Sequence, residues 1–323
     1  MPPRAHLARR VPERVLHELE LQFDLTVHDS ERPPTREELL EAVRGCSGLV
    51  TTPTEGVDEE LLDAAGEGLR VVANYAVGYD NVDVEAATRR GVLVANTPGV
   101  LSETTAELTL ALLLALLRRV VEGDRLIRRR ERWALAPTFM LGRGLRGRTL
   151  GIVGLGRIGS EVARLAAAFG MEVVYTNRSG PADAPYEWLP LPELLARADV
   201  VSLHSPLTPE TRHLMGREQL RAMRSDAVLV NTTRGPIVDE AALVEALRAG
   251  EIAGAALDVF EHEPEVDEGL LELGNVVLAP HLGSATEETR EAMGLLCVEA
   301  LRAVLLESRC PPNAVNPEVW RSA

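Results

Sequence analysis

Gly154-Leu155-Gly156-Arg157-Ile158-Gly159 is a Gly-x-Gly-x-x-Gly motif near the middle of the 323-residue chain. An apolar, partly β-branched run over residues 148–153 precedes it and predicts a buried parallel strand, and residues 160–169 follow with apolar side chains at helical spacing. In such a strand–turn–helix unit the glycines permit the tight turn, the approach of a pyrophosphate and close helix packing. The helix N-terminus adds N–H donors and a positive dipole. The motif therefore predicts a dinucleotide site, with a ligand-free tight turn as the alternative.

The type of dinucleotide is indicated by the residues that follow the next predicted strand, over residues 171–176. An acidic residue at this place would hydrogen-bond the ribose of NAD. The chain instead has Asn177-Arg178-Ser179, and an arginine beside small polar groups suits the 2′-phosphate of NADP. A solvated polar turn is the other interpretation. We expect NADP(H) to be preferred, with NAD(H) possible.

Length and composition limit the classes of protein to consider. A chain of 323 residues predicts about two domains. The formal net charge of −15 argues against nucleic-acid and anionic-membrane partners, although a few arginines could still bind a small anionic substrate. The three cysteines have neither metal-ligand nor disulfide spacing, which fits a reducing cytoplasm. The longest apolar run, residues 108–117, is too short to cross a bilayer. We expect a cytoplasmic protein.

Strand-like and helix-like stretches alternate on both sides of the glycine motif. Thr35 and Asp58 are predicted to cap helices that end near Val43 and Gly66. The expected strands cover residues 5–7, 25–28, 48–52, 69–74, 92–96, 199–204, 227–231, 253–258 and 275–280. This alternation predicts parallel sheets with helices on both faces.

A long helix is expected from an N-cap at Ser102 to about Arg130. Its middle is apolar nearly all round, which predicts burial between domains or against a second subunit. An irregular segment follows and ends at the strand before the glycine motif. A last long helix over residues 287–306 and an extended, Pro-rich tail over residues 311–317 complete the expected elements.

Three polar residues, Arg234, Glu263 and His281, lie at or just beyond the carboxyl ends of late predicted strands, where open α/β sheets bind ligands. For hydride transfer, an arginine would hold a substrate carboxylate and a histidine would exchange the alcohol proton, with the glutamate stabilising the imidazolium. Taken singly, they could be a surface ion pair, a turn cap and a loop histidine. Their shared position, in a chain with a dinucleotide turn, favours the catalytic interpretation.

Five stretches of the chain together resemble the D-isomer-specific 2-hydroxyacid dehydrogenases, with the glyoxylate/hydroxypyruvate reductase branch most similar. They are residues 75–83, 154–159, 231–240, 257–264 and 279–286. The resemblance implies an α/β fold of two doubly wound parallel-sheet domains. A Rossmann cofactor domain over residues 99–284, with a dimerisation helix and arm, would be inserted into a discontinuous flavodoxin-like substrate domain over residues 1–98 plus 285–323.

The resemblance also implies roles for individual residues. Arg234 would bind the substrate, His281 would be the acid/base and Glu263 its partner, while the backbone N–H groups of Val77 and Gly78 would bind the substrate carboxylate. Arg157 and Ile158 would flank the pyrophosphate, and Asp258 would approach the nicotinamide amide. The full expected cofactor set is Gly154, Gly156, Arg157, Ile158, Gly159, Asn177, Arg178, Ser179, Thr232, Asp258, His281 and Gly283. No metal is expected.

We therefore expect a homodimeric reductase of small 2-oxo acids. Alternatives are a D-lactate-type or phosphoglycerate-type dehydrogenase of the same family, and an NAD(P)H-sensing, corepressor-like binding protein. One departure from the branch concerns Trp133, because a second tryptophan often follows at the place where this chain has Leu135. Leu135 would leave a different or roomier pocket wall, and Trp133 could equally serve plain interface packing.

Overall fold

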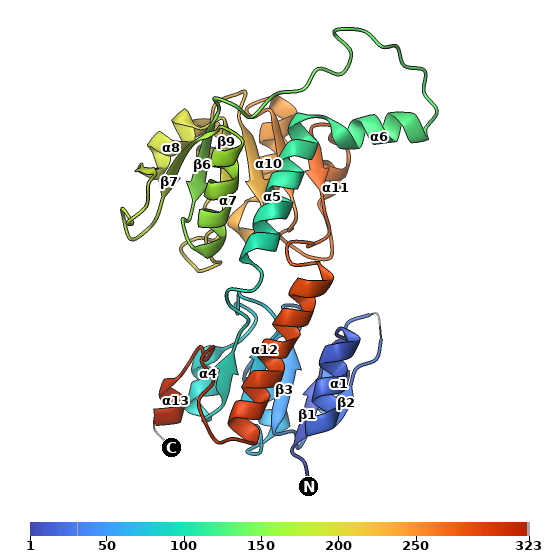
Figure 1. The fold of residues 1–323 in the computed structure, drawn as a ribbon, viewed down its shortest axis with the longest axis vertical. Helices are drawn as coiled ribbons and strands as arrows, with labels where there is room; N and C mark the ends of the chain where they lie inside the picture. Colours follow the sequence, from blue (N-terminus) through green and yellow to red (C-terminus); the bar gives the residue numbers. More distant parts are fainter. Residues whose placement is uncertain (31, 322–323) are drawn as a thin grey trace. The chain divides into compact units, whose positions relative to one another are not determined.

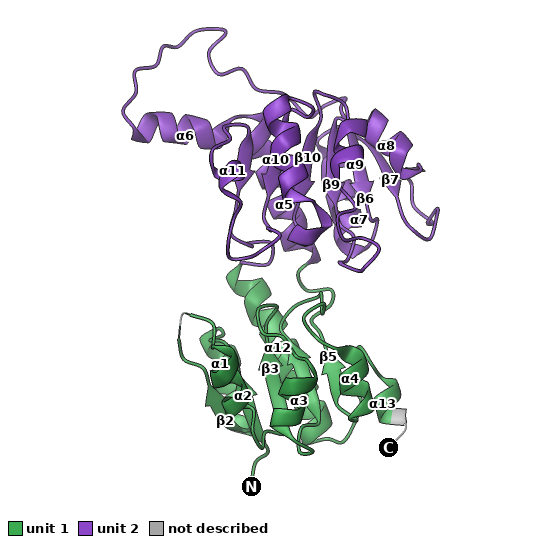
Figure 2. Ribbon diagram, turned by 180° about the vertical axis from the view of Figure 1, so that it is seen from behind, with its two compact units in different colours: residues 1–101, 286–323 green, residues 102–285 purple. Residues whose placement is uncertain are grey.

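The computed structural model describes residues 1–30 and 32–321, and the chain divides into two compact units (Figure 2). Unit 1 contains Met1–Leu101 and Thr286–Ala323, and unit 2 contains Ser102–Ala285. Unit 2 is thus inserted into unit 1. The boundaries expected from the sequence, after residues 98 and 284, lie a few residues before those of the compact units.

Unit 1 is built on a five-stranded parallel sheet in the flavodoxin-like order β2-β1-β3-β4-β5. The strands are β1 (Arg4–Leu7), β2 (Asp24–Val27), β3 (Gly48–Thr51), β4 (Val71–Asn74) and β5 (Leu93–Ala95). The helices, several of them labelled in Figure 1, are α1 (Glu13–Gln22), α2 (Arg36–Ala42), α3 (Glu59–Ala65), α4 (Val84–Arg89), α12 (Glu287–Leu305) and α13 (Glu318–Arg321). Because the strands are parallel, the loops over residues 52–55, 75–79 and 96–97 share one edge of the sheet.

Side-chain caps explain where two helices of unit 1 begin. Thr35 forms a capping box with Glu38: Thr35 Oγ1 accepts the Glu38 N–H, and the Glu38 carboxylate accepts the Thr35 N–H. Asp58 accepts the Leu61 N–H at 3.0 Å at the start of α3. Each such cap contributes about 1 kcal/mol to helix stability. Both caps predicted from the sequence are confirmed.

Helix α12 covers part of the unit 1 sheet although it comes from the far end of the chain. It packs against β3, β4 and α1. One of these contacts requires glycine, because a Cβ at Gly294 of α12 would lie 2.5 Å from Val15 of α1. The approach is also close at Gly48 of β3, where a Cβ would lie 3.0 Å from Leu305. After α12, Ala314 forms an antiparallel bridge with Ala95. The C-terminal segment is therefore a core element of the unit that begins at residue 1.

His6 on β1 is a buried titratable group of unit 1. Its Nδ1 lies 2.8 Å from Thr26 Oγ1, and its Nε2 has no hydrogen-bond partner among the described residues. Burial, together with the nearby His28, lowers the pKa of His6 from 6.5 to about 4. The fold therefore keeps His6 neutral while the unfolded chain protonates it. We expect the free energy of unfolding to fall by about 3 kcal/mol as the pH drops through this interval.

Equilibrium unfolding in urea, measured at several values from pH 7 to pH 4, tests this expectation. The variant His6→Gln should lose that part of the pH dependence, because it has no group to protonate. An identical pH dependence in the variant and the wild type would show that His6 does not contribute.

Unit 2 contains a seven-stranded parallel sheet in the order β12-β11-β10-β9-β6-β7-β8. The strands are β6 (Thr149–Val153), β7 (Glu172–Thr176), β8 (Glu187–Trp188), β9 (Val200–Leu203), β10 (Val228–Asn231), β11 (Gly254–Leu257) and β12 (Val276–Leu278). The strand order reverses at β6, with β7 and β8 on one side and β9 to β12 on the other. This is the Rossmann arrangement, and the fold class predicted from the sequence is confirmed.

The helices of unit 2 cover both faces of its sheet. They are α5 (Ser102–Leu117), α6 (Val120–Arg128), α7 (Arg157–Ala168), α8 (Leu191–Arg197), α9 (Arg217–Ala222), η1 (Gly235–Ile237), α10 (Glu240–Ala249) and α11 (Glu268–Leu271). On one face, Leu113 of α5 and Ala166 of α7 belong to the same core as Ile152 of β6. On the other face, Leu194 of α8 belongs to the same core as Val153. The neighbouring residues Ile152 and Val153 of β6 thus pack into the cores on opposite faces of the sheet.

The prediction of one continuous helix from Ser102 to about Arg130 is wrong, because the helix is interrupted at Arg119. The structure has two helices, α5 and α6, and Arg119 between them has a left-handed backbone with φ of 55° that no continuous helix can contain. The apolar α5 packs against α7 and against β10, β11 and β12 of its own unit, so it needs neither the other domain nor a second subunit to be buried. In the described part of the chain, no helix is long and apolar enough to cross a membrane.

Residues 118–148, which we call the arm, comprise α6 and the irregular segment after it. In Figure 1 they extend away from the rest of unit 2. None of the residues of α6 is buried. Ile127 is 56% exposed, Trp133 53% and Leu135 96%. The Trp133 and Phe139 rings stack on each other at 6.4 Å between centroids. The arm thus presents apolar side chains that its own chain does not cover.

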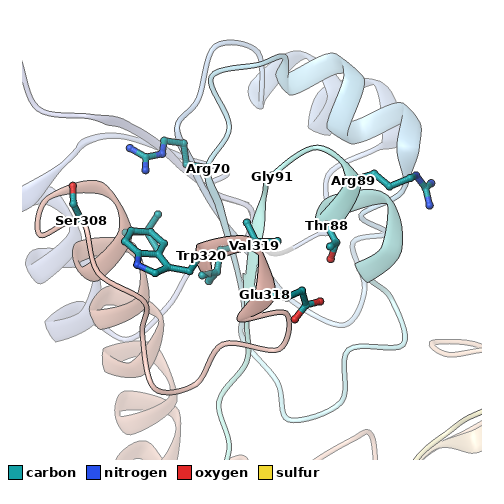
Figure 3. Close-up of a pocket in the computed structure, with 10 residues that line it drawn as sticks. Arg70, Thr88, Arg89, Gly91, Ser308, Glu318, Val319 and Trp320 are labelled. Carbon is teal, nitrogen blue, oxygen red and sulfur yellow. The ribbon is translucent and has the colours of Figure 1, made fainter. Parts of the chain in front are cut away.

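A pocket of about 520 Å³ lies at the amino-end edge of the unit 1 sheet (Figure 3). Arg70 and Gly91, which come just before β4 and β5, line it together with Ser308 and Trp320. The loops over residues 52–55 and 75–79 lie at the opposite edge of this sheet. The pocket is therefore separate from Val77 and Gly78, the expected substrate-binding residues of this unit.

Candidate active site

The glycine motif forms the turn between β6 and α7, and two of its glycines are required sterically. Gly154 has a φ of +100°, and a Cβ at Gly159 would lie 2.3 Å from the Gly154 carbonyl oxygen. At Gly156, by contrast, an added Cβ would meet no atom within 4 Å, so the backbone there faces open space. The turn fits a pyrophosphate, which needs unobstructed backbone of this kind.

Helix α7 begins directly after Gly156 and has no side-chain cap. The N–H groups of its first turn, which includes Arg157 and Ile158, have no acceptors within the helix and lie at the positive end of its dipole. The side chain of Asn177 supports this turn, because its Oδ1 accepts the Leu155 N–H at 2.7 Å. The N-terminus of α7 is therefore a fitting place for anionic phosphate oxygens.

Residues 177–179 follow β7 at the outer side of the glycine turn. Arg178 Nη1 lies 3.6 Å from Glu210 Oε2, and the two side chains are 79% and 65% exposed. Ser179 is exposed as well. An ion pair this open to water is weak, so the Arg178 guanidinium can exchange Glu210 for another anion.

His281 and Glu263 form a hydrogen-bonded pair beyond β12 and β11. His281 Nδ1 lies 2.8 Å from Glu263 Oε2, and Glu263 Oε1 accepts the Phe260 N–H at 3.0 Å. These contacts fix both the carboxylate and the imidazole ring. Because Nδ1 is engaged, Nε2 is the ring nitrogen that is left to exchange a proton.

The Glu263 carboxyl group is held in its ionised form. Burial opposes ionisation, but the hydrogen bond and charge of His281, the Phe260 N–H and the charge of Arg234 outweigh it and lower the pKa of Glu263. Glu263 is therefore a carboxylate at neutral pH and accepts a hydrogen bond at His281 Nδ1.

Asp258, at the end of β11, fixes the loop that carries His281. Its two carboxylate oxygens accept the N–H groups of Leu282 at 2.7 Å and Gly283 at 2.8 Å, and its carbonyl accepts the His281 N–H at 2.8 Å. His281 has a left-handed φ of 56°, an uncommon conformation that these bonds hold in place. Burial raises the pKa of Asp258 against the opposing effect of the two N–H groups. Asp258 is the residue expected to approach the nicotinamide amide, but both of its carboxylate oxygens accept hydrogen bonds from the loop that carries His281.

Arg234 follows β10 and is joined to the Glu263 loop by close backbone packing. Asn231 Nδ2 donates to the Arg234 carbonyl at 3.0 Å. A Cβ at Gly235 would lie only 1.8 Å from the Phe260 carbonyl oxygen. The segment that carries Arg234 therefore touches the residue whose N–H holds Glu263.

Two further expected cofactor residues, Thr232 and Gly283, are tied to α5. The Thr232 and Thr109 hydroxyls are 2.9 Å apart, and the Thr105 hydroxyl donates to the Gly283 carbonyl at 3.0 Å. Helix α5 therefore supports the loops after both β10 and β12.

The expected catalytic and cofactor residues of unit 2 all lie at or beyond the carboxyl ends of its strands. The glycine turn and residues 177–179 follow β6 and β7, whereas Arg234, Glu263 and His281 follow β10, β11 and β12, with β9 between the two groups. This order suits an elongated ligand with its phosphates at β6 and its reactive end near His281.

Val77 and Gly78 belong to unit 1 and form the turn after β4. Their carbonyls are occupied: Val77 O accepts from Asn96 Nδ2 and Gly78 O from Asn74 Nδ2, each at 2.8 Å. Their N–H groups have no hydrogen-bond partner among residues 1–30 and 32–321. The turn thus offers two unused donors, which suit an anion.

Sequence reasoning missed the supporting roles of Asn74, Asn96 and Asp258, and it did not foresee that Asn177 holds the glycine turn. A signal was available for all four, because each lies at or directly after the carboxyl end of a strand. Polar side chains at that edge of a parallel sheet can reach the loops of neighbouring strands.

Comparison with known proteins places the chain in a family. The family model described as D-isomer specific 2-hydroxyacid dehydrogenase, NAD binding domain, matches residues 110–283. A protein named glyoxylate reductase from Korarchaeum cryptofilum is 51% identical over 99% of this chain and 97% of its own length. The chain belongs to the D-isomer specific 2-hydroxyacid dehydrogenase family. The resemblance seen in the sequence motifs is confirmed.

Solved structures are similar to the chain along nearly its whole length. The structure of the TT0316 protein from Thermus thermophilus is 51% identical with a TM-score of 0.92, covering 97% of this chain and 99% of that one. An NADPH-dependent glyoxylate/hydroxypyruvate reductase from Sinorhizobium meliloti, solved with NADP and malonate, is 36% identical with a TM-score of 0.85, covering 98% and 97%. The chain is an NAD(P)-dependent dehydrogenase, and the matched dinucleotide-binding domain lies within unit 2.

Proposed function

We propose that this dehydrogenase reduces small 2-oxo acids with NADPH, and that glyoxylate and hydroxypyruvate are its leading substrates. The observation that carries the proposal is the His281–Glu263 pair, with Arg234 close by, on the sheet that also bears the glycine turn. The names of the similar glyoxylate reductases support the substrate class. They do not favour the lactate-type, phosphoglycerate-type or corepressor-like alternatives.

The chemistry requires a hydride, which the bound nicotinamide supplies to the carbonyl carbon of the substrate. Arg234 binds the substrate carboxylate and polarises the carbonyl. In unit 1, the N–H groups of Val77 and Gly78 are donors that suit a carboxylate. His281 donates the Nε2 proton to the carbonyl oxygen, which completes the hydroxyl group of the product. Glu263 orients the imidazole through its hydrogen bond at Nδ1.

Initial rates with glyoxylate, hydroxypyruvate and pyruvate, each with NADPH and with NADH, test this function. Fast turnover of either of the first two with NADPH is expected. Turnover with NADH alone would contradict the cofactor assignment. Turnover of none of the three would contradict the substrate class and point to the binding-protein alternative.

Preference for NADPH is expected to depend on Arg178, because its guanidinium can exchange the exposed Glu210 carboxylate for the 2′-phosphate. The variant Arg178→Ala should raise the KM for NADPH by about 10- to 100-fold, the loss typical of a charged hydrogen bond, and should change the KM for NADH little. Glu210→Gln is the matched control and should keep NADPH binding, because it removes the carboxylate charge that pairs with Arg178 and leaves Arg178 in place. Equal changes for the two cofactors would contradict the assignment.

We also propose that the arm joins two copies of the chain into a homodimer. The arm contains ten arginines and three acidic residues, whereas the whole chain has a net charge of −15, so the remainder of a second copy is strongly acidic. The exposed apolar side chains of the arm, including Val120, Ile127, Leu135 and Leu141, supply the apolar part of such an interface. On this proposal Trp133 and Leu135 are interface residues.

Sedimentation velocity tests the dimer. The wild type should sediment as a dimer that weakens with increasing salt, since opposite charges contribute. The double variant Ile127→Asp and Leu135→Asp should be a monomer. Leu21→Asp changes an exposed leucine outside the arm, on α1, and should remain dimeric. A monomeric wild type, or a dimeric double variant, would rule out this interface.

A further inference from the structure

The turn after β4 is held by two asparagine side chains that come from different strand ends. Asn74, the last residue of β4, donates to the Gly78 carbonyl, and Asn96, directly after β5, donates to the Val77 carbonyl, each at 2.8 Å. In the sequence, these donors lie 4 and 19 positions from the carbonyls that they bind. The contact from Asn96 therefore exists only because β4 and β5 are neighbours in the sheet.

Holding a carbonyl also fixes the N–H group on the other side of the same peptide. In a trans peptide the C=O and the following N–H point in opposite directions. The Val77 carbonyl shares its peptide with the Gly78 N–H, so Asn96 directs that N–H away from itself. The Ala76 carbonyl, which accepts the Thr97 N–H at 2.9 Å, shares its peptide with the Val77 N–H. The anchors at the end of β5 thus determine where both unused donors point.

Each asparagine is itself held in position. Asn74 is fully buried and exchanges two amide hydrogen bonds with Asn81, at 3.3 and 3.2 Å. Asn81 donates in turn to the carbonyls of Thr52 and Glu55 in the loop after β3, at 3.0 and 2.9 Å. The backbone carbonyl of Asn96 accepts the side-chain amide of the buried Asn313 at 2.6 Å. The side chain of Asn74 and the backbone of Asn96 are therefore both held in place.

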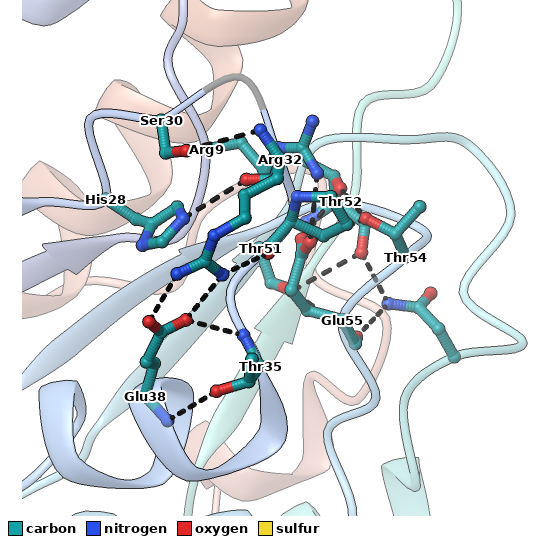
Figure 4. Close-up of polar contacts among 12 residues, drawn as sticks. Arg9, His28, Ser30, Arg32, Thr35, Glu38, Thr51, Thr52, Thr54 and Glu55 are labelled. Carbon is teal, nitrogen blue, oxygen red and sulfur yellow. Dashed lines mark hydrogen bonds and ion pairs between the residues drawn. The ribbon is translucent and has the colours of Figure 1, made fainter.

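The loop after β3 is rigid for a reason of its own. Glu55 is only 4% exposed, and its carboxylate accepts the Thr52 N–H at 2.9 Å and the hydroxyls of Thr52 and Thr54 at 2.7 and 2.5 Å (Figure 4). These hydrogen bonds to the buried Glu55 carboxylate hold the loop in one conformation. The same loop fixes Asn81, and Asn81 fixes Asn74.

We propose that Asn96 is a positioning residue for the substrate carboxylate. It holds the Val77 carbonyl so that the Gly78 N–H is presented to the anion before it arrives, beside the Val77 N–H that the Thr97 contact directs, and this removes the cost of ordering the two donors on binding. Asn74 supports the same turn from the Gly78 carbonyl, whose peptide carries the Tyr79 N–H. An amide is required because it donates to a carbonyl without carrying a negative charge near an anionic ligand. The proposal rests on the proposed function for the identity of that ligand as a carboxylate.

The test uses the enzyme with all 323 residues and oxalate, an anion that the enzyme cannot reduce. Calorimetry gives the Kd of oxalate for the complex with NADP, and steady-state kinetics give kcat and the KM for glyoxylate. In Asn96→Ala, the Kd of oxalate and the KM should rise together by about tenfold, the effect of one lost hydrogen bond of moderate strength. The values of kcat and of the Kd for NADPH should change little, because the carboxylate is bound equally in the ground and transition states. Asn96→Asp should raise the Kd of oxalate further.

Asn316→Ala is the matched control. Asn316 is buried in the same unit and hydrogen-bonds the backbone of Val92 at 3.0 Å and Val94 at 2.7 Å, but it does not touch the turn. This variant should lower the melting temperature and keep the affinity for oxalate. Equal loss of affinity in Asn96→Ala and Asn316→Ala, or wild-type affinity in Asn96→Ala, would overturn the positioning role.

The outcomes separate this proposal from the proposed function. A wild type that binds oxalate but reduces no 2-oxo acid, with weakened oxalate binding in Asn96→Ala, would overturn the function and support the positioning role. A wild type that reduces glyoxylate, with wild-type oxalate affinity in Asn96→Ala, would support the function and overturn the positioning role. A wild type that neither binds oxalate nor turns over would overturn both.

Discussion

The variant His281→Gln should lower kcat for glyoxylate reduction by about 10²- to 10⁴-fold, the range attributed to a general acid. Glutamine can still donate a hydrogen bond to Glu263, but it has no proton to transfer to the carbonyl oxygen. The loop should keep its shape, because Asp258 holds it through backbone N–H groups and not through the imidazole. Affinity for NADPH should therefore remain close to that of the wild type.

Single-turnover kinetics that follow NADPH fluorescence test this expectation, because they separate the chemical step from product release. His262→Gln is the matched control, since it removes a histidine from the same loop, next to Glu263, without touching the pair. Its single-turnover rate should equal that of the wild type. Wild-type turnover in His281→Gln would remove His281 from the mechanism.

The second large effect is expected at Arg234, where Arg234→Gln should lower kcat/KM for glyoxylate by about 10³-fold. A guanidinium contributes two charge-assisted hydrogen bonds to a carboxylate, and a neutral amide replaces neither of them fully. Arg234→Lys should recover only part of the loss, because an ammonium group is a point charge without the planar pair of donors.

Steady-state kinetics with varied glyoxylate at saturating NADPH measure this effect. Arg212→Gln is a suitable control, because Arg212 is an exposed arginine of the same unit that pairs with Glu261 at 3.1 Å. Its kcat/KM should match that of the wild type. A change of less than threefold in Arg234→Gln would show that the carboxylate is bound elsewhere.

The parts of the fold that could be predicted from the sequence are those with local causes. The strand–turn–helix unit around Gly154–Gly159 follows from sterics within a few residues, as the contact between a Gly159 Cβ and the Gly154 carbonyl shows. The helix caps at Thr35 and Asp58 are local in the same way. The alternation of strands and helices then restricts the sheets to parallel pairing.

The features that could not be predicted depend on neighbours distant in sequence or on an unusual backbone. Nothing in Arg118-Arg119 signals that a helix must end there, because arginine is a good helix former and rarely adopts a left-handed conformation. The burial of α5 is decided by α7, whose packing the sequence does not reveal. Likewise, the contact of Asn96 with the Val77 carbonyl requires the register between β4 and β5.

The late position of α12 has a consequence for how the protein is made on the ribosome. Unit 2 is one continuous segment and can fold as soon as it has emerged, whereas unit 1 lacks α12 until residues 287–305 have been translated. At about 5–20 residues per second, roughly 200 residues separate β5 from the end of α12, a delay of about 10–40 s. During this interval the nascent chain carries an uncovered sheet surface, so the inserted unit matures before the one that surrounds it. Chaperone binding over that period would protect the first hundred residues from aggregation.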